Sequence, residues 1–461
     1  MDDRKINALY REALAGRLSR REVLRWAGAL GLSLPVSALL AACRGGQSEA
    51  PSPGAPGVPT VATPRASPGA SPGAAGQVTR QYAGTTIRWS TSLAEDERAV
   101  FDRIILPDFA RKTGTRVEVL QIEAADFVRQ LQAQVRAGRV EVDLFAIDNN
   151  SLAPLVGNQL IEDLTQYEDR IPPETISSLL PVLRFNDRLY FLPYRPNVQI
   201  VYYNTGEFTK AGLRPPQTWD ELMNVAKTFS DREKVGRVAL QGASGSPVGV
   251  TVTEFIWQAG GDPLVLNSAQ SQQAFQYLQG LNRYLSPQTA TAKFDTMNTY
   301  LANNSVYLGP NWPFGVNVIV RDTGRQDIHS YPSWSGPAGK AKVLGGEVLG
   351  IPRRSPNRAA AIVFAQYLMS KETQEMLTRE LAWPAVRSDA FGTVTDWQKP
   401  YFESVRLALE NAKARPNVVY WGEVERIMSD AWNEIVSGGA PVKETLDRYQ
   451  RQFEQAKQQG G

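Results

Sequence analysis

The segment from residue 86 to residue 147 alternates strand-like and helix-like patterns, and this alternation constrains the fold more than any other feature of the chain. Short β-branched and apolar runs at 86–90, 116–120 and 142–147 are typical of strands. Between them, apolar residues recur at helical spacing: Val100, Phe101, Ile104 and Phe109 first, then Phe127, Leu131 and Val135, with Gly138 ending the second helix. This order predicts an α/β fold, with a mostly parallel sheet covered by helices on both faces.

The remainder of the chain is richer in helical patterns. Thr218 followed by Glu221 predicts a helix that begins with a capping box, in which each side chain accepts a bond from a free backbone amide. Four more helices are expected, at 358–369, 402–412, 423–436 and 442–456. About 380 residues follow position 82, which is long enough for two domains with separate cores.

The first 42 residues have the pattern of an export signal. A charged segment containing Arg20-Arg21 precedes an uncharged run from Trp26 to Leu40 and a few small residues. The arginine pair resembles a twin-arginine signal. Residues 40–43, Leu-Ala-Ala-Cys, resemble the lipobox of bacterial lipoproteins, which implies that Cys43 is acylated after residues 1–42 are removed. The alternative is a retained anchor helix, but the run is short for a membrane span and contains glycine and proline.

Residues 43–82 are expected to form a tether. Seven prolines and five glycines lie between Pro51 and Gly76 with a single charge, Arg65, so this segment cannot bury an apolar core. An acylated Cys43 at its start would hold the folded region near a membrane surface. The predicted location is therefore extracytoplasmic, with a lipid anchor to the cell membrane at the cell surface or in the periplasm.

Composition excludes several kinds of chemistry. With Cys43 acylated, the chain has no thiol for a disulfide, a zinc site or a nucleophile, and its one histidine, His329, cannot build a multi-histidine metal site. No Gly-x-Ser-x-Gly elbow occurs. Residues 1–42 carry seven Lys/Arg and four Asp/Glu, which leaves 43 of each in the remainder, without the basic patch typical of nucleic-acid binding. We therefore expect no catalytic residue, metal or cofactor.

Six further segments resemble, in order and spacing, those of the extracellular solute-binding proteins of ABC importers, in particular the sugar-binding family that includes maltose-binding protein. The most legible is 211–222, AGLRPPQTWDEL. The other five lie at 142–148, 186–204, 258–261, 309–312 and 345–352. Together with the opening strands and helices, the resemblance covers essentially everything from residue 85 onward.

This resemblance implies a type II periplasmic-binding-protein fold, with two lobes joined by crossing segments and a ligand cleft between them. The N-terminal lobe is expected at 83–195 and 345–380, and the C-terminal lobe at 196–344 and 381–461. It also implies a monomer without enzymatic activity that binds a carbohydrate and works with ABC permease subunits in the cytoplasmic membrane.

Candidate ligand contacts follow from the sheet and from the resemblance. Ligands on open parallel sheets bind beyond the carboxyl ends of strands, where Ser90 to Glu95 and Asp148 are expected. A sugar site combines carboxylates, amides and arginine at the ring edge with aromatic rings under the ring face. By motif position, the predicted contacts are Ser90, Glu95, Asp148, Asn149, Tyr194, Arg195, Asn197, Trp312, Gly346, Glu347, Trp383 and Trp421.

Several of these residues also have ordinary structural interpretations. Trp312 is the preferred stacking platform, whereas Trp219 and Trp257 are expected in the core. Glu95 could serve only as a helix N-terminal charge, and Arg195 could merely pair with an acid across the hinge. Asn197 falls where maltose-binding protein has an acidic contact, so its ligand partner is left open.

The ligand class is left open between several alternatives. The available aromatic residues favour a di- or oligosaccharide such as an α-glucoside, while Arg195 leaves open a glycerol-phosphate-type solute. Tyr202-Tyr203 are reminiscent of ferric-binding relatives, although the apolar run 198–201 places at least one of the two rings in the core. Glu95 and Asp148 could form the carboxylate pair of a polysaccharide-active enzyme.

Overall fold

The computed structural model describes residues 80–122 and 124–460, which belong to one compact unit, Gly73–Gly461. The signal segment, Cys43 and the tether up to residue 79 lie outside the described residues. Within the two described stretches, no helix combines the length and apolar character that crossing a bilayer would need.

The first sheet confirms the predicted parallel core and adds three further strands to it. Parallel strands β1 (Thr86–Thr91), β2 (Arg116–Gln121) and β3 (Leu144–Asp148) have β1 in the middle. Strand β10 (Lys342–Gly350) then pairs antiparallel with β3, and β6 (Leu192–Val198) pairs antiparallel with β10. The short β11 (Ala412–Ala414) runs parallel to the first residues of β10.

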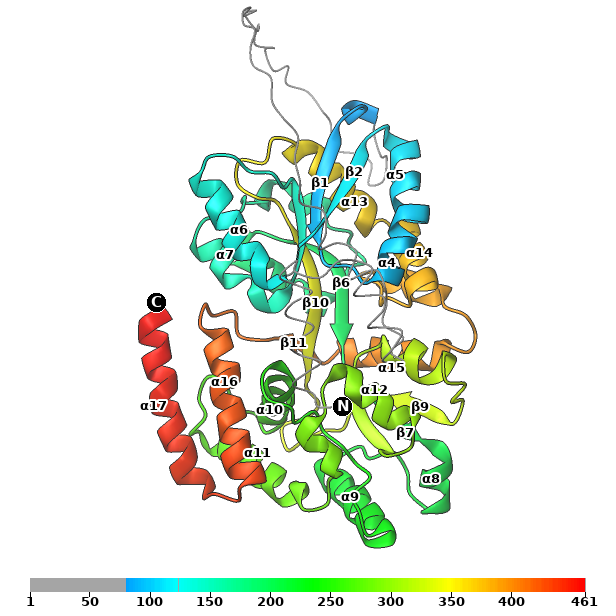
Figure 1. Ribbon diagram of the computed structural model, residues 1–461, viewed down its shortest axis with the longest axis vertical. Coiled ribbons are helices and arrows are strands. Elements are labelled where there is room, and N and C mark those ends of the chain that lie inside the picture. The colour runs from blue at the N-terminus through cyan, green and yellow to red at the C-terminus, as the bar shows by residue number, and fades with distance from the viewer. Residues whose placement is uncertain (1–79, 123, 461) are drawn as a thin grey trace, which may run out of the picture. The chain divides into compact units, whose positions relative to one another are not determined.

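Helices lie on both sides of these strands (Figure 1). They are α4 (Glu95–Val100), α5 (Leu106–Thr113), α6 (Ala124–Arg136), α7 (Ala153–Gly157), α13 (Arg358–Met369) and α14 (Lys371–Leu381). A π-helical stretch, Phe101–Ile105, joins α4 to α5. Its wider turn buries Ile105 fully and leaves the expected Ile104 only partly buried, because the extra residue shifts the face of the helix.

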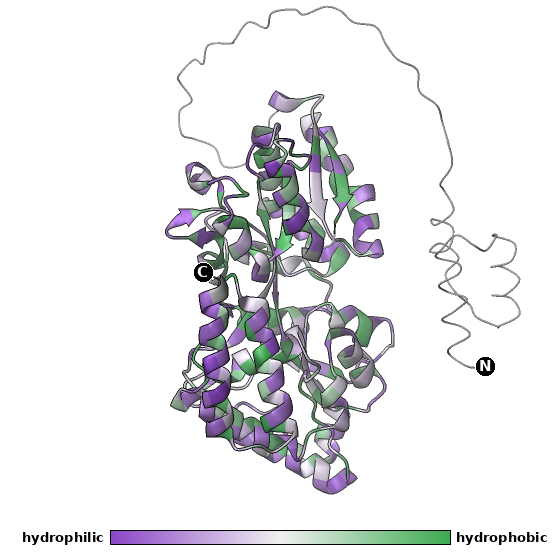
Figure 2. Cartoon of the chain, turned by 60° about the vertical axis from the view of Figure 1, so that its left-hand side comes forward, coloured by the Kyte–Doolittle hydropathy of each residue, from purple (hydrophilic) through white to green (hydrophobic). Residues whose placement is uncertain are grey.

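A second group of elements surrounds a three-stranded antiparallel sheet, ordered β8 (Leu308–Asn311), β7 (Ile200–Asn204), β9 (Ile328–Tyr331). Its helices are α8 (Thr205–Lys210), α9 (Trp219–Glu233), α10 (Ser246–Gln258), α11 (Ala269–Asn282), α12 (Phe294–Ala302), α15 (Lys399–Leu409), α16 (Trp421–Ala431) and α17 (Val442–Gly460). The helices expected in the C-terminal third are all present. Figure 2 shows α17 as mostly hydrophilic, and its buried stripe is Leu446, Tyr449 and Phe453.

The helix predicted at Thr218 begins as expected, with one difference in its cap. The Thr218 hydroxyl accepts from the Glu221 amide at 3.2 Å, while Glu221 accepts from the amide of Gln217 at 2.6 Å. Trp219 then packs in a core with Leu222 and Phe229. Its indole stacks on Tyr277, with ring centroids 4.4 Å apart, which agrees with the core interpretation.

Two large apolar cores divide most of the buried side chains between them, one around the first sheet and one around α9, α10 and α16. Residues around Trp383, Val386 and Phe402 pack in the first of these cores. The packing therefore does not change at residue 381 and does not mark the lobe boundary expected there. That boundary stays a prediction.

Strand β10 connects the two groups of elements, and Figure 1 shows it beside β6 between them. At its start, the Lys342 ammonium donates to the Glu254 carboxylate of α10 at 2.7 Å, and the second oxygen of Glu254 accepts from the Val343 amide at 3.0 Å. The Lys342 side chain is only 1% exposed. A buried charge needs such a partner, so this pair fixes the start of β10 on α10.

Candidate functional site

Three neighbouring strands bring a row of charged residues together. In the strand register, Glu347 of β10 lies opposite Asp148 of β3 on one side and opposite Arg195 of β6 on the other. Side chains directly opposite each other on neighbouring strands lie close together. The row therefore places two carboxylates and one guanidinium at the crossing of β6 and β10, beyond the carboxyl end of β3.

Two glycines just before Glu347 make this crossing possible. Gly346 has φ +97°, and a Cβ there would overlap the carbonyl oxygen of Arg195. A Cβ on Gly345 would lie 2.8 Å from the Trp312 ring. A side chain at either position would therefore displace β6 or Trp312, which explains why both positions need glycine.

Five of the predicted contacts line one small cavity beside this row: Asn149, Tyr194, Arg195, Gly346 and Glu347. Its volume is about 10 Å³, which is room for one water-sized group. Two polar atoms of its lining residues, the Tyr194 hydroxyl and Glu347 Oε2, are buried without a hydrogen-bond partner among the described residues. Buried polar atoms are normally paired, so these two mark a place where a bound group would be stabilised.

Arg195 is held by a carboxylate and an indole. Its guanidinium is 2.8 Å from Glu97 Oε1 and lies 4.0 Å from the centre of the Trp383 ring. The Trp383 indole also donates to Glu97 Oε1, at 3.0 Å. Sequence reasoning missed Glu97 and chose Glu95, which is exposed on the same first turn of α4. Helical geometry was the available signal, since residues two positions apart point to different sides.

A second arginine completes the site from a distant part of the chain. Arg415 lies just after β11, is 5% exposed, and donates to Asp148 Oδ1 at 3.2 Å and Asn149 Oδ1 at 3.4 Å. It also lies 3.5 Å from Glu425 of α16. No motif marks Arg415 in the sequence, and it lies 267 positions from Asp148, so only tertiary packing could reveal it.

Four other predicted contacts do not line the cavity: Ser90, Asn197, Trp312 and Trp421. Asn197 is opposite Gly345 in the strand register, and Trp312 covers Gly345 within a small cluster with Val250 and Val343. Ser90 is buried within β1. Trp421 packs in the second core and does not line the cavity. Trp257 is only partly buried, against the Trp312 cluster and outside the two large cores, so its core interpretation stays a prediction.

Burial dominates the chemistry of Glu347. It raises the pKa of this carboxyl from the ordinary 4.5 to about 7; Arg195 opposes the shift, while Asp148 and Glu97 add to it. Burial also raises the pKa of the Tyr194 phenol well above its usual value. Tyr194 therefore keeps its proton, while Glu347 is divided between its two forms at neutral pH.

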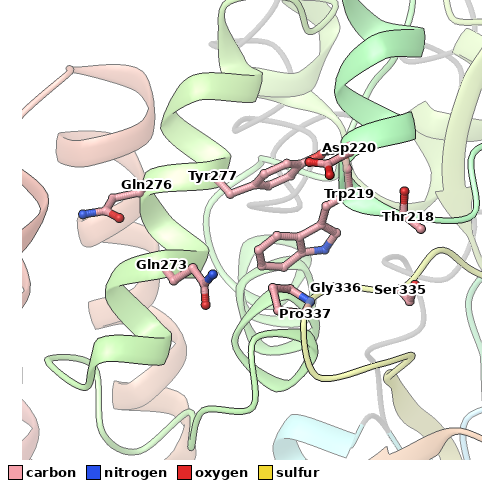
Figure 3. A pocket seen from close by; sticks show the side chains of 9 residues that line it. All are labelled: Thr218, Trp219, Asp220, Gln273, Gln276, Tyr277, Ser335, Gly336 and Pro337. Carbon is pink, nitrogen blue, oxygen red and sulfur yellow. Dashed lines mark hydrogen bonds between the residues drawn. The ribbon is translucent and has the colours of Figure 1, made fainter.

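A larger hollow, of about 510 Å³, lies elsewhere on the second group of elements. Figure 3 shows the stacked rings of Trp219 and Tyr277 among its lining residues. Gln273 and Gln276 of α11 line it as well, and so do Gly336 and Pro337. It has no charged row, and its one acid is the exposed Asp220. The strand crossing is therefore the better candidate for ligand binding.

The ferric alternative has little structural support. Tyr202 is fully buried, and its hydroxyl donates to the Trp312 carbonyl at 3.1 Å, which confirms that one ring of the pair packs in the core. Within residues 80–122 and 124–460, no group of three or more His, Cys, Asp or Glu side chains is arranged to hold a metal ion.

Replacing Glu347 should change how stability depends on pH. The folded carboxyl keeps its proton up to about pH 7, whereas the unfolded one releases it near 4.5, so wild-type stability falls as pH rises across this window. The Glu347→Gln variant lacks this loss and should gain about 2.5 kcal/mol on wild type between pH 5 and pH 8. Urea unfolding at several pH values measures it.

The control for that experiment is Glu118→Gln, an exposed carboxylate on β2, whose stability should follow the wild-type curve. A Glu347→Gln curve that also runs parallel to wild type would contradict the assignment of a buried, proton-holding carboxyl.

Comparison with solved structures shows the fold. The structure is similar to the sugar-binding protein MalE from Xanthomonas citri, with a TM-score of 0.72 and 17% identity over 81% of this chain and 98% of that one. It is also similar to maltose-bound T. maritima MalE3, with a TM-score of 0.67 and 20% identity over 80% and 99% of the two chains. These matches confirm the two-lobe periplasmic-binding-protein fold.

Sequence comparison identifies the family. A stretch of 62 residues is 32% identical to the multiple sugar-binding protein of Streptococcus mutans, but it spans only 13% of this chain and 14% of that relative. The family model described as bacterial extracellular solute-binding protein matches residues 105–400, well over half of the chain. The chain therefore belongs to the family of bacterial extracellular solute-binding proteins.

Proposed function

We propose that this protein binds a carbohydrate outside the cytoplasm and delivers it to the permease of an ABC importer. The observation that carries the proposal is the row of Asp148, Glu347 and Arg195 beside a cavity lined by two residues, Tyr194 and Glu347, that each have an unpaired buried polar atom. Carboxylates, an amide and phenol oxygens suit the hydroxyl groups of a sugar. Family membership supports an extracytoplasmic location and a role in binding without catalysis.

The finer proposal is a di- or oligosaccharide, with α-glucosides first. The relatives with this fold include a maltose-bound protein and a cyclic alpha-maltosyl-1,6-maltose binding protein from Arthrobacter globiformis, the latter with 20% identity over 82% of this chain and 100% of that one, at a TM-score of 0.69. Trp312, whose ring lies against Gly345 beside the crossing, is the aromatic residue that we propose to stack on a sugar ring.

Two further parts of the proposal concern anchoring and assembly. We infer that Cys43 carries the lipid and that the expected tether ends before Arg80, since Arg80–Tyr82 form a 3-10 helix with Tyr82 packed against the first core. The protein would then work as a monomer near its permease. The lipobox-like residues 40–43 and the Pro/Gly-rich composition support this part.

A glycerol-phosphate-type ligand is disfavoured by the partners of the two arginines. Arg195 is paired with Glu97, and Arg415 lies between Asp148 and Glu425. A phosphate would have to displace a carboxylate from one of them. A neutral polar solute meets no such competition.

A thermal-shift screen tests the function. Saccharides, polyols and sugar phosphates should be compared on the same protein, with maltose and trehalose among the first. A ligand at 100 times its Kd stabilises the folded state by about 2.7 kcal/mol, so a true ligand should raise Tm measurably. If sugar phosphates raise Tm and no neutral saccharide does, the proposal of a neutral saccharide ligand is wrong.

Trp312→Ala should weaken saccharide binding by about 2 kcal/mol, or ~30-fold in Kd, because the indole would cover one face of a sugar ring. Trp219→Ala is the matched control: it should lower Tm and leave the affinity of the folded protein unchanged, since Trp219 packs in the second core. Calorimetric titration of both variants shows which of the two tryptophans contributes to saccharide binding. The opposite pattern would move the site to the hollow of Figure 3.

We also expect binding to change the angle between the lobes. The cavity holds only about 10 Å³, enough for one group of the ligand, so the rest of the sugar must be held outside it between the two lobes, and the strands that can bend are β6 and β10 near Pro193–Asn197 and Gly345–Gly346. A ligand shifts the population toward the conformation it binds better. Small-angle scattering with and without a saturating saccharide should give different radii of gyration, and identical profiles would contradict this expectation.

A further inference from the structure

The cavity at the strand crossing has a specific hydrogen-bonding demand. Tyr194 keeps its proton and offers a hydroxyl with no partner, and Glu347 Oε2 offers lone pairs with no donor. Both side chains line the same cavity. A group bound there must donate to the carboxylate, and it gains a second bond if it also contacts the phenol oxygen.

The size of the cavity limits what that group can be. About 10 Å³ accommodates one water-sized group. The hydroxyl oxygen or the amine nitrogen of a saccharide meets this limit. An N-acetyl or O-methyl group adds atoms that the walls, formed by β6, β10 and Leu179 to Leu183, have no room for.

The surrounding charges limit it further. Four carboxylates, those of Glu97, Asp148, Glu347 and Glu425, share the site with two guanidinium groups. Each guanidinium already has a carboxylate partner, and Glu347 has none. An anionic substituent beside Glu347 would therefore meet like charge, and like charges in a partly buried site repel strongly.

We propose that the cavity between Tyr194 and Glu347 binds a single donor group of the saccharide, a hydroxyl or a protonated amine, and rejects acylated and acidic substituents at that position. This inference rests on the proposed carbohydrate function and specifies how the site selects among saccharides. The donor lies between the phenol oxygen and the carboxylate, and both protein groups become paired when it binds.

A pH dependence follows from the same geometry. The groups that face Glu347 are Arg195 and Tyr194 on β6, Asp148 on β3 and Glu97 on α4. Burial raises the pKa of Glu347 to about 7, and a donor requires the ionised form. Affinity should therefore rise as pH increases through 7 and then level off.

The test uses the neutral disaccharide that stabilises the protein most in the screen, with maltose and trehalose as first probes. At each ring position, its hydroxyl is replaced in turn by hydrogen, an amine, an N-acetylamino group or, at the primary carbon, a carboxylate. Titration calorimetry should find one position where removal of the hydroxyl weakens binding at least tenfold, the N-acetyl form does not bind, and the amine form binds. A carboxylate should weaken binding at least tenfold.

Two variants tie that position to the two residues. Glu347→Gln should weaken binding of the parent disaccharide at least tenfold and remove the pH dependence. Tyr194→Phe should weaken it several-fold, and because the phenol oxygen has no partner in the free protein, this variant should fold normally. Glu118→Gln, on the exposed face of β2, is the matched control and should bind like wild type.

The two possible donors give different results within the series. If the amine form binds tighter than the parent, the preferred donor is an ammonium group; if it binds more weakly, the donor is a hydroxyl. The inference is wrong if no single ring position matters, because the cavity then holds only solvent, or if a carboxylate form binds tighter than its parent. Absence of any saccharide binding would instead overturn the proposed function itself.

Discussion

The arrangement of the site depends on the pairing of β10 with strands from both halves of the protein. Residues 347–350 of β10 pair with β3, residues 342–344 pair with β11, and residues 344–349 pair with β6. The Lys342–Glu254 ion pair fixes the start of the strand on α10. Because a strand register sets every side-chain position along a pair, this one strand decides where the charged residues of both halves meet.

The close approach of backbones at this crossing has a consequence for function. Gly345 and Gly346 let Trp312 and the Arg195 carbonyl approach β10 more closely than a side chain would allow. The positive φ of Gly346 and the register shift between Glu347 and Val348 make the pairing of β6 with β10 irregular at this point. A crossing with small residues and interrupted pairing is a natural place for two lobes to change their angle, and the cavity lies beside it.

The charges of the site are unevenly balanced. Arg195 is stacked on Trp383 and paired with Glu97, and Arg415 is held between Asp148 and Glu425, so both cations are oriented before any ligand arrives. Glu347 Oε2 is buried without a donor, and whereas Glu425 Oε1 also lacks a hydrogen bond but has Arg415 at 3.5 Å, Glu347 has no ion-pair partner among the described residues. An unpaired buried carboxyl is costly, and proteins tend to keep such groups where a ligand or a proton can satisfy them. The imbalance therefore points to the group around which recognition is organised.

The sequence by itself determined the local structure. Apolar spacing predicted β1 to β3, the helices between them and the C-terminal helices, because each pattern reports the period of its own element. The family motifs led to Asn149, Tyr194, Arg195, Gly346 and Glu347, which line one cavity. Only tertiary structure decided the antiparallel pairing of β6 and β10, the replacement of Glu95 by Glu97 beside Arg195, the burial of Trp421 and the presence of Arg415. Pairing register and contacts between residues hundreds of positions apart leave no periodic trace in a sequence, since they arise when separate elements pack together.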